Sequence, residues 1–312
     1  MIGSHLVDAL IERGEEVIVL DNFLTGRREN LAHLSSSPRL HLVEADVSAV
    51  PDLHDEVGPV DRVYHLASPA SPVDFARYPI ETLMTNAVGA RNALDLTQRC
   101  GARFLLASTS EIYGDPEEHP QPETYRGNVN SLGPRSCYDE GKRFAESLTM
   151  TYRRSHEVDV RIARLFNTFG PRSRADDGRV VPTFCVQALS GQPLTVFGSG
   201  LQTRSLCYVS DIVRGLIGLM ETPDIAGEVV NLGSPQERTV LEIAEIIASL
   251  AGAPCRIEGG PLPVDDPARR CPDISKAQRL LGWQPEIDLQ PGLERTLAHF
   301  REILALPCGA AA

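Results

Sequence analysis

Short apolar runs alternate with helical patterns through the first half of the chain, and this alternation limits the possible folds more than any other feature. Strands are expected at 16–21, 40–46, 61–67, 102–109 and 159–166. Helices are expected at 3–13, where Gly14 would end the pattern, and at 80–99 and 138–155. Strands that alternate with helices need crossover connections, so we predict an α/β fold with a doubly wound parallel sheet.

The pattern changes after about residue 167, where Pro and Gly separate shorter elements. These are expected at 195–198, 209–221, 228–232, 240–250 and 293–304. We therefore predict a smaller lobe over 167–312, partly interleaved with a first domain over 1–166. Because ligands of open parallel sheets bind at the carboxyl ends of the strands, a lobe placed there would close over a substrate.

Composition restricts the partners and the setting. The 312 residues carry a net charge of −12, which argues against a nucleic-acid partner and against a polybasic membrane surface. No apolar run approaches the length of about 20 residues that a membrane helix needs. The seven cysteines show no CxxC and no zinc-ligand spacing, so we expect no metal site and a reducing, cytoplasmic setting.

Tyr138 and Lys142 are spaced i and i+4, so they share one face of the expected helix. Lys142 is one of only two lysines in the chain. An ammonium beside a phenol favours the phenolate and lowers the pKa of the Tyr. Such a Tyr is a base for a sugar hydroxyl as a hydride leaves. The alternative is an unrelated surface pair.

Thr109, Ser110 and Glu111 follow a buried strand at its carboxyl end. A hydroxyl and a carboxylate there would reach the same pocket as Tyr138. Thr109 would then hydrogen-bond the reacting oxygen, and Glu111 would act on a neighbouring carbon or on a water. The alternative is a helix cap or a serine/threonine turn after the strand.

Acids also end the two earlier strands. Asp21, followed by Asn22, would accept both ribose hydroxyls of an adenosine and disfavour a 2′-phosphate by its charge. Asp46 ends the next strand and would meet the adenine edge. The alternative for Asp21 is a solvent-facing acid at a strand end.

Four residues of the second half suit a diphosphate: Asn167, Arg172, Arg204 and Arg270. The guanidinium fork binds phosphate in a bidentate manner. For any one of 28 arginines a surface ion pair is the simpler interpretation. The segments 198–204 and 265–270 favour the binding role for Arg204 and Arg270.

At these residues the sequence resembles the extended short-chain dehydrogenase/reductases that act on nucleotide sugars. The resemblance covers nearly the whole length and is most specific in 105–123, 133–143, 161–172, 176–184, 193–211 and 265–277. Within that family it is closest to the branch that decarboxylates UDP-glucuronate. The resemblance implies a Rossmann-type sheet that binds NAD, with a C-terminal lobe that binds a UDP-sugar.

The family's functional positions map onto this chain residue by residue. The implied NAD contacts are Gly3, Asp21, Asn22, Asp46, Val47, Leu66, Ala67, Asn86, Tyr138 and Lys142. The implied catalytic group is Thr109, Glu111, Tyr138 and Lys142. The implied nucleotide-diphosphate contacts are Asn167, Arg204 and Arg270.

The resemblance also implies a reaction cycle. Tyr138 removes the carbon-4 hydroxyl proton while a hydride passes to NAD, and the resulting β-keto acid loses carbon dioxide. Thr109 and Tyr138 stabilise the enolate, carbon 5 is protonated, and the hydride returns to give UDP-xylose. Glu111 positions the ring or a relay water.

Related activities remain as alternatives. The 4,6-dehydratases of the family carry Thr-Asp-Glu, whereas Ser110 here cannot act as that acid. The 4-epimerases typically lack a glutamate at the position of Glu111. A 4-epimerase is the first alternative, and a dehydratase is another.

The start of the sequence departs from the family pattern. Members begin with a strand and a GxxGxxG turn, of which only the last glycine, Gly3, is present. The first strand and two glycines are expected to be missing, so a truncated, inactive relative is a further alternative. Family members are commonly dimers formed through two helices of the first domain, and a homodimer is expected here.

Overall fold

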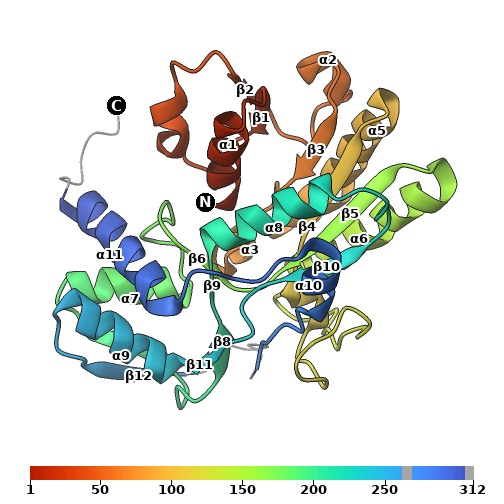
Figure 1. Ribbon diagram of the computed structural model, residues 1–312. Helices are drawn as coiled ribbons and strands as arrows, with labels where there is room; N and C mark the ends of the chain where they lie inside the picture. Colours follow the sequence, from red (N-terminus) through yellow and green to blue (C-terminus); the bar gives the residue numbers. More distant parts are fainter. Residues whose placement is uncertain (262–268, 306–312) are drawn as a thin grey trace.

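A computed structural model describes residues 1–261 and 269–305 of the chain, and Figure 1 shows how its elements are arranged. Residues 265–268 of the predicted diphosphate motif and the end of the predicted second domain lie outside the described residues. Within them the chain forms parallel strands covered by helices, so the α/β prediction is confirmed.

Four parallel strands form the central sheet. Their order is β10-β5-β4-β3, and each is in register with its neighbour over three or more residue pairs. The strands are β3 (Arg62–His65), β4 (Arg103–Thr109), β5 (Asp159–Leu165) and β10 (Val229–Leu232). Because all four run in one direction, their carboxyl ends form one edge, at which the sequence places its candidate catalytic residues.

The first two strands, β1 (Val17–Asp21) and β2 (Leu40–Glu44), form a separate parallel pair with Val17 opposite Leu40. In the described part of the chain, β1 pairs with β2 alone and the central sheet ends at β3. The single sheet expected from the sequence is therefore divided in two, since no described strand joins β1 to β3.

Helices cover both faces of the central sheet. On one face α5 (Ala90–Cys100) and α6 (Ser136–His156) pack against apolar residues such as Phe104 and Leu106. On the other face α8 (Val209–Glu221) and α10 (Ser275–Leu281) pack near Leu105. Figure 1 shows α8 crossing the sheet. The alternation of β4 side chains between the two cores is the period of a strand that is buried on both faces.

The expected helix over 80–99 is present but interrupted. It begins as α4 (Pro79–Met84), passes through a π-helical turn, η2 (Thr85–Gly89), and continues as α5. Such π turns inside helices are frequent at functional sites. The turn carries Asn86, a predicted cofactor contact. The first helix, α1 (Ile2–Glu12), matches its expectation closely.

A second group of elements surrounds an apolar core beside the sheet, to which Leu6 and Leu10 of α1 also contribute. Its helices are α7 (Val180–Leu189), α9 (Val240–Ala251) and α11 (Leu289–Ala305). Its strand pairs are β6 (Thr168–Phe169) with β9 (Cys207–Tyr208), β7 (Leu194–Phe197) with β12 (Ile257–Gly260), and β8 (Thr203–Ser205) with β11 (Glu237–Thr239). Figure 1 shows this lobe at lower left. Since β10 joins the central sheet, the second half also contributes to the first.

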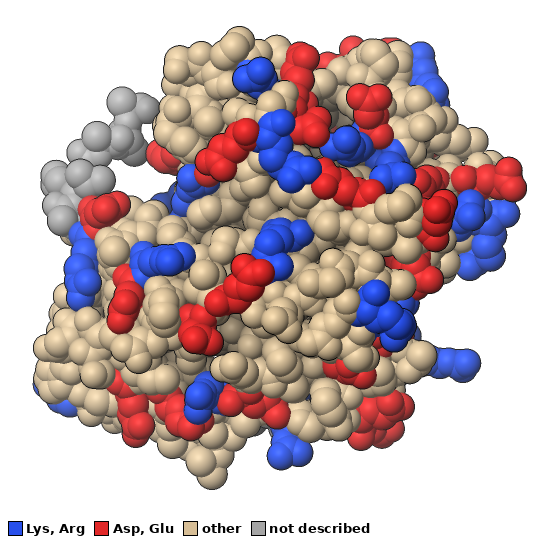
Figure 2. Space-filling model, in the orientation of Figure 1, with Lys and Arg blue, Asp and Glu red and all other residues tan. Residues whose placement is uncertain are grey.

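Four shorter helical segments complete the described elements: α2 (Leu53–Val57), α3 (Pro72–Arg77), η1 (Arg28–Leu34) and η3 (Ser110–Tyr113). Figure 2 shows Lys and Arg side chains interspersed with Asp and Glu side chains over the face that it draws. Among the described residues, no helix combines the length and apolarity needed to cross a membrane.

Candidate active site

Thr109 and Tyr138 meet at the carboxyl edge of the central sheet. Thr109 is the last residue of β4, and Tyr138 lies in the first turn of α6, which packs against that strand. Both side chains are buried, and their hydroxyls share a hydrogen bond. The Thr109 hydroxyl also accepts the Glu111 amide at 3.2 Å, so it caps η3 as well. The two sequence interpretations of Thr109 are therefore compatible.

Lys142 lies one helical turn after Tyr138 and is buried. Its Nζ donates to the Ala107 carbonyl of β4 at 2.8 Å, which fixes the ammonium beside the strand. Burial lowers the pKa of Lys142 to about 8, against the opposing charge of Glu146. A lysine with this pKa exchanges protons readily near neutral pH.

The protonation of Tyr138 differs from the sequence prediction. Burial raises the pKa of Tyr138 to about 12, although the Thr109 hydrogen bond acts to lower it. The ring stacks on Phe75 at 5.4 Å between centroids, in an apolar surrounding. The prediction of a pKa lowered by Lys142 is therefore wrong for this structure, because loss of solvation costs the phenolate more than nearby groups return.

Two arginines hold Glu111. Its Oε2 lies 2.6 Å from Arg135 Nη2 and 3.2 Å from Arg270 Nη2. Burial acts to raise the pKa of Glu111, but the charges of Arg270 and Arg135 outweigh it and the pKa is lowered. Glu111 is therefore an ionised carboxylate with a fixed orientation.

Arg270 is 1% exposed and donates to the backbone around Glu111. It contacts the carbonyl of Ser110, and it reaches the carbonyl of Gly114 at 3.0 Å. Arg204 of β8 donates to the Thr203 carbonyl at 2.8 Å, and its charge acts on both Glu111 and Arg270. The structure thus brings Arg204 and Arg270 together with Glu111 of the predicted catalytic group.

Arg135 and Asp139 were not predicted. Burial and then Glu111 raise the pKa of Asp139 to about 7, against the charges of Arg135 and Arg270. Arg135 lies three residues before Tyr138, and Arg135 and Asp139 are spaced i and i+4. That spacing on the face that carries Tyr138 was the available signal.

The predicted adenosine contacts lie together after β1 and β2. Asn22 Nδ2 donates to Asp46 Oδ2 at 2.9 Å, and Asp21 ends β1, where its Oδ1 accepts the Phe23 amide at 2.8 Å. Burial acts to raise the pKa of Asp46, but hydrogen bonds from Ser48 and Asn22 lower it overall. A Cβ on Gly26 would come within 3.1 Å of the Asp21 carboxylate, so glycine leaves that carboxylate accessible.

The predicted nicotinamide-side wall follows β3 and lies on η2. Leu66 and Ala67 come directly after β3 and are partly buried. Asn86 donates to Ser68 Oγ at 2.9 Å and to the Thr82 carbonyl at 2.8 Å. Its Oδ1 is buried with no hydrogen-bond partner among the described residues. An unpaired buried acceptor is costly, so it fits a wall that receives a polar cofactor group.

Three further predicted residues remain: Val47 directly follows Asp46, and the other two lie on or against α1. Val47 is buried against Gly89 of η2. Gly3 lies in the first turn of α1, and a Cβ there would meet nothing within 4 Å. Arg172 pairs with Asp8 of α1 at 2.6 Å, so the structure places it against the first helix. The substrate role of Arg172 stays a prediction.

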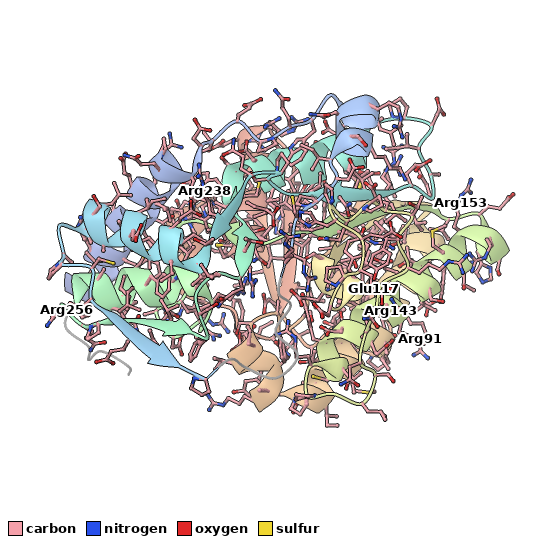
Figure 3. The ribbon with its side chains drawn as sticks, turned by 90° about the horizontal axis from the view of Figure 1, so that it is seen from below. Arg91, Glu117, Arg143, Arg153, Arg238 and Arg256 are labelled. Atoms are coloured by element: carbon pink, nitrogen blue, oxygen red, sulfur yellow. The ribbon has the colours of Figure 1, made fainter. Side chains whose placement is uncertain are left out.

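The last predicted residue, Asn167, connects the sheet to the lobe. It lies between β5 and β6, and its carbonyl accepts the Cys207 amide at 2.9 Å. Figure 3 shows Arg238 of β11 among the elements of the lobe and Arg143 of α6 beside the sheet. Arg238 is opposite Arg204 in the β8–β11 pair.

A parallel sheet with an acid at the end of β1 and a Tyr–Lys pair beside Thr109 defines a dinucleotide-dependent enzyme that acts on a hydroxyl. The chain belongs to the NAD dependent epimerase/dehydratase family, whose model matches residues 1–233. NAD is therefore its cofactor.

Curated relatives and solved structures agree with this family. UDP-glucuronic acid decarboxylase 1 of Arabidopsis thaliana is 55% identical over 96% of this chain, which spans 67% of the relative's length. UDP-glucuronic acid decarboxylase 3 of the same plant is 52% identical over 98% of this chain and 88% of the relative. UDP-glucuronic acid 4-epimerase from Bacillus cereus, solved with UDP-glucuronic acid and NAD, has a TM-score of 0.89 at 28% identity over 97% of this chain and 96% of its own.

Proposed function

We propose that this chain decarboxylates UDP-glucuronate to UDP-xylose through a 4-keto intermediate. The observation that carries the proposal is the group at the end of β4. There the Thr109 and Tyr138 hydroxyls share a hydrogen bond beside Glu111, which Arg135 and Arg270 hold ionised. Identities of 50–55% to curated decarboxylases support it.

The described residues fit the cofactor. Asp21 and Asn22 would hold the adenosine ribose, Asp46 would meet the adenine, and Asn86 and Lys142 would face the nicotinamide end. Bound NAD supplies the acceptor and donor for the hydride that leaves carbon 4 and returns to it. A carboxylate at Asp21 favours NAD over its 2′-phosphate by charge.

Tyr138 accepts the proton of the carbon-4 hydroxyl. Its Oη is oriented by the Thr109 hydrogen bond, so both hydroxyls contact the same substrate oxygen. Lys142, held by the Ala107 carbonyl, places a cation on the same helix face. With a Tyr138 pKa of about 12, the phenol is protonated at neutral pH and must give up its proton before it acts as a base.

Once carbon 4 is a ketone, the sugar carboxylate is β to it, and carbon dioxide leaves without a separate acid. The enolate oxygen that develops lies at the Thr109 and Tyr138 hydroxyls, which stabilise it by hydrogen bonds. Arg204 and Arg270 supply the local positive charge that draws an anionic substrate to a chain of net charge −12. A 4,6-dehydration would need an acid where buried Ser110 stands.

The experiment incubates the purified chain with NAD and UDP-glucuronate and follows carbon dioxide and the nucleotide sugar by mass spectrometry. We expect carbon dioxide and UDP-xylose. A product that keeps the carboxylate would establish a 4-epimerase instead, as in the Bacillus cereus enzyme. No turnover by protein that binds NAD would overturn the decarboxylase, and absence of NAD binding would support an inactive relative.

We also propose a homodimer. Apolar side chains are exposed on neighbouring helices, namely Ile80, Leu83 and Met84 of α4 and Phe144 of α6. An exposed apolar surface of this kind favours association. Sedimentation should give a dimer, and the double variant Ile80→Asp/Phe144→Asp should sediment as a monomer. A monomeric wild-type chain would contradict the proposal.

We propose a cytoplasmic location. The six cysteines of the described residues are free, and free thiols fit a reducing compartment. Cell fractionation of tagged full-length protein tests this, and recovery in a secreted or membrane fraction would contradict it.

A further inference from the structure

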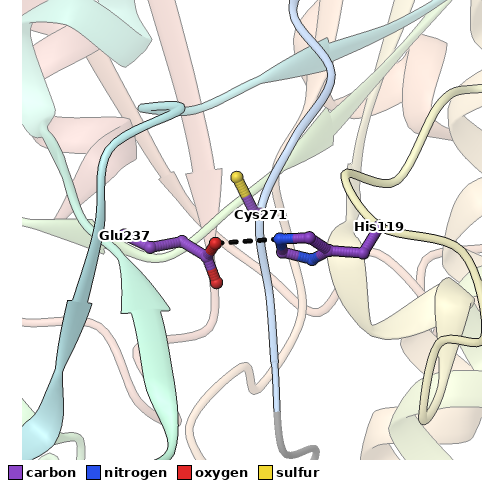
Figure 4. A group of neighbouring side chains, drawn as sticks. All are labelled: His119, Glu237 and Cys271. Atoms are coloured by element: carbon purple, nitrogen blue, oxygen red, sulfur yellow. Dashed lines mark ion pairs between the residues drawn. The ribbon is translucent and has the colours of Figure 1, made fainter.

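Three side chains with metal-binding atoms meet next to the segments that carry Arg204 and Arg270. They are His119, Glu237 and Cys271, and Figure 4 shows them pointing toward one another from three separate segments. Their ligand atoms all lie within 4.8 Å of one another, and His119 Nε2 is 2.9 Å from Glu237 Oε2. None of the three belongs to the catalytic group.

Backbone hydrogen bonds hold two of these segments together. The Gln121 amide donates to the Cys271 carbonyl at 2.8 Å, and the Asp273 amide donates to the Gln121 carbonyl at 3.0 Å. The Gln121 side chain also accepts the Cys271 amide at 2.9 Å. The approach of His119 to Cys271 is therefore built into the fold.

The third ligand is oriented by a strand pair. Glu237 lies on β11, opposite Ser205 of β8. The Thr203 hydroxyl donates to Glu237 Oε1 at 2.6 Å, which leaves Oε2 directed at His119. A hydrogen bond from outside the ligand set that fixes one carboxylate oxygen is the usual support of a metal ligand.

We propose that His119, Glu237 and Cys271 form a site for Zn²⁺ with a fourth position open to water. Imidazole, carboxylate and thiolate are the ligands that Zn²⁺ takes, at about 2.0–2.3 Å in tetrahedral geometry. Those bond lengths imply ligand–ligand separations of about 3.3–3.8 Å. The present separations, from 2.9 Å to at most 4.8 Å, bracket this range, so small side-chain rotations complete the site.

The charges balance when the ion binds. The Cys271 thiol loses its proton to solvent and becomes a thiolate, so thiolate and carboxylate neutralise the ion, and neutral His119 supplies a lone pair. Cys271 is 4% exposed, while His119 and Glu237 keep 30% and 25% of their side-chain surface exposed. The sulfur is thus shielded, and the other two ligands leave a path for the ion.

The proposed Zn²⁺ site lies next to the two arginines that are predicted to bind the substrate diphosphate, but it does not include them. Cys271 directly follows Arg270, and Glu237 pairs beside Arg204 across β8 and β11. A bound ion therefore ties the segment that carries Arg270 and the loop that carries His119 to β11, the strand that pairs with the Arg204 strand β8. Because it binds the folded chain, it should raise the thermal unfolding midpoint.

Titration of the full chain with CoCl₂ tests the proposal, since a thiolate bound to Co²⁺ gives charge-transfer absorption in the near ultraviolet. We expect this absorption to saturate at about one equivalent and to be reversed by ZnCl₂. It should be lost in Cys271→Ser, and Co²⁺ and Zn²⁺ affinity should fall in His119→Ala. Thr203→Val, which removes only the support of Glu237, should weaken Zn²⁺ binding by about 10- to 100-fold.

Two matched variants serve as controls. His41→Ala breaks a His–Glu pair of similar distance, 2.8 Å, that does not belong to the group of His119, Glu237 and Cys271. Cys255→Ser removes an exposed thiol that is also outside this group. Both should bind Co²⁺ as the wild type does. Absence of the absorption in the wild-type chain, or its persistence in Cys271→Ser, would overturn the proposal. If Cys271→Ser does not fold by circular dichroism, unchanged Zn²⁺ affinity in the exposed His119→Ala variant overturns it equally.

Discussion

The carboxyl end of the four-stranded sheet and that of the β1–β2 pair carry the two halves of the proposed site, and they differ in burial. Thr109, Tyr138 and Lys142 are buried beside β4. Asp21 and Asp46 are only partly buried, Asn22 is exposed, and the residues of β1 are all partly exposed.

This difference in burial matches the two roles that we propose for the halves, which are chemical reaction and cofactor recognition. Groups that must change protonation gain from a dry, fixed surrounding, where each interaction with developing charge is stronger. Groups that bind an adenosine need only oriented acceptors, and Asp21 and Asp46, which are proposed for this role, offer such acceptors at the protein surface. Substitutions in the buried half should therefore have much larger effects than those in the exposed half.

The largest effect is expected for Tyr138→Phe. The variant keeps the ring that stacks on Phe75 and loses only the hydroxyl that is proposed to take up the substrate proton. We expect kcat to fall by about 10²–10⁴-fold, with KM little changed. Steady-state assays with UDP-glucuronate measure this, and calorimetry with NAD shows whether the cofactor site is intact. A kcat within tenfold of the wild type would remove Tyr138 from the reaction.

The next largest effect is expected on stability, from Arg164→Met in the central sheet. Arg164 binds Glu146 through two contacts of 2.8 and 3.0 Å, and their side chains are 11% and 12% exposed. Arg164→Met would leave Glu146 without that partner, so we expect the unfolding free energy to fall by about 3–5 kcal/mol. Urea titration measures the loss.

An exposed ion pair at β1 and β2 can be compared with this buried one. His41 of β2 and Glu16 lie 2.8 Å apart with side chains 49% and 73% exposed. We expect His41→Ala to change the unfolding free energy by less than about 1 kcal/mol, because solvent screens the pair. Equal losses of unfolding free energy in Arg164→Met and His41→Ala would mean that burial does not make the ion pair of one half stronger than that of the other.

A further prediction uses pH. The pKa of Asp139 is raised from its ordinary 3.8 to about 7 by burial and by Glu111, so the folded chain binds a proton that the unfolded chain releases. Stability therefore falls as pH rises from about 4 to about 7, by up to about 4 kcal/mol. Asp139→Asn should remove this fall.

Thermal unfolding of wild type and Asp139→Asn at pH 5 and pH 8 provides the measurement. The variant should gain stability relative to the wild type at the higher pH. Glu111 has a lowered pKa, so its contribution is lost only as pH falls below its ordinary 4.5, outside the two test conditions. A constant difference between the chains at both pH values would contradict the assigned pKa of Asp139.

The elements that the sequence predicted well are those with long periodic patterns. The helix expected over 209–221 has those bounds in the structure, and the strands of the central sheet lie within two residues of expectation. The strand pairs β6 with β9 and β8 with β11 were missed because two or three residues are too few for a period, whereas β7 lies within one residue of the element expected over 195–198. The π turn was missed because it does not break the apolar pattern of its helix.

The predictability of the site residues also depended on whether they lie in a continuous stretch of sequence. Tyr138, Lys142, Thr109 and Glu111 lie in contiguous motifs, and the structure brings them together. The pKa of Tyr138 could not be predicted, since it depends on burial against Phe75, which comes from another helix. The sequence did not indicate the site of His119, Glu237 and Cys271, because these residues are far apart in the chain and their spacing matches no zinc motif.

The smallest effect on the proposed activity is expected in the exposed half, from Asp21→Asn. Asparagine keeps an acceptor for the Phe23 amide, so the turn after β1 should survive, and only the charge is lost. Hydrogen bonds to a carboxylate are about twice as strong as those to a neutral amide, so we expect NAD affinity to fall by about tenfold. Binding of the 2′-phosphorylated cofactor should improve, because the repelling charge is gone. Calorimetry with both dinucleotides measures the ratio. Since the reacting groups are untouched, kcat at saturating NAD should stay near the wild-type value, and a loss as large as that of Tyr138→Phe would show that the two halves do not act separately.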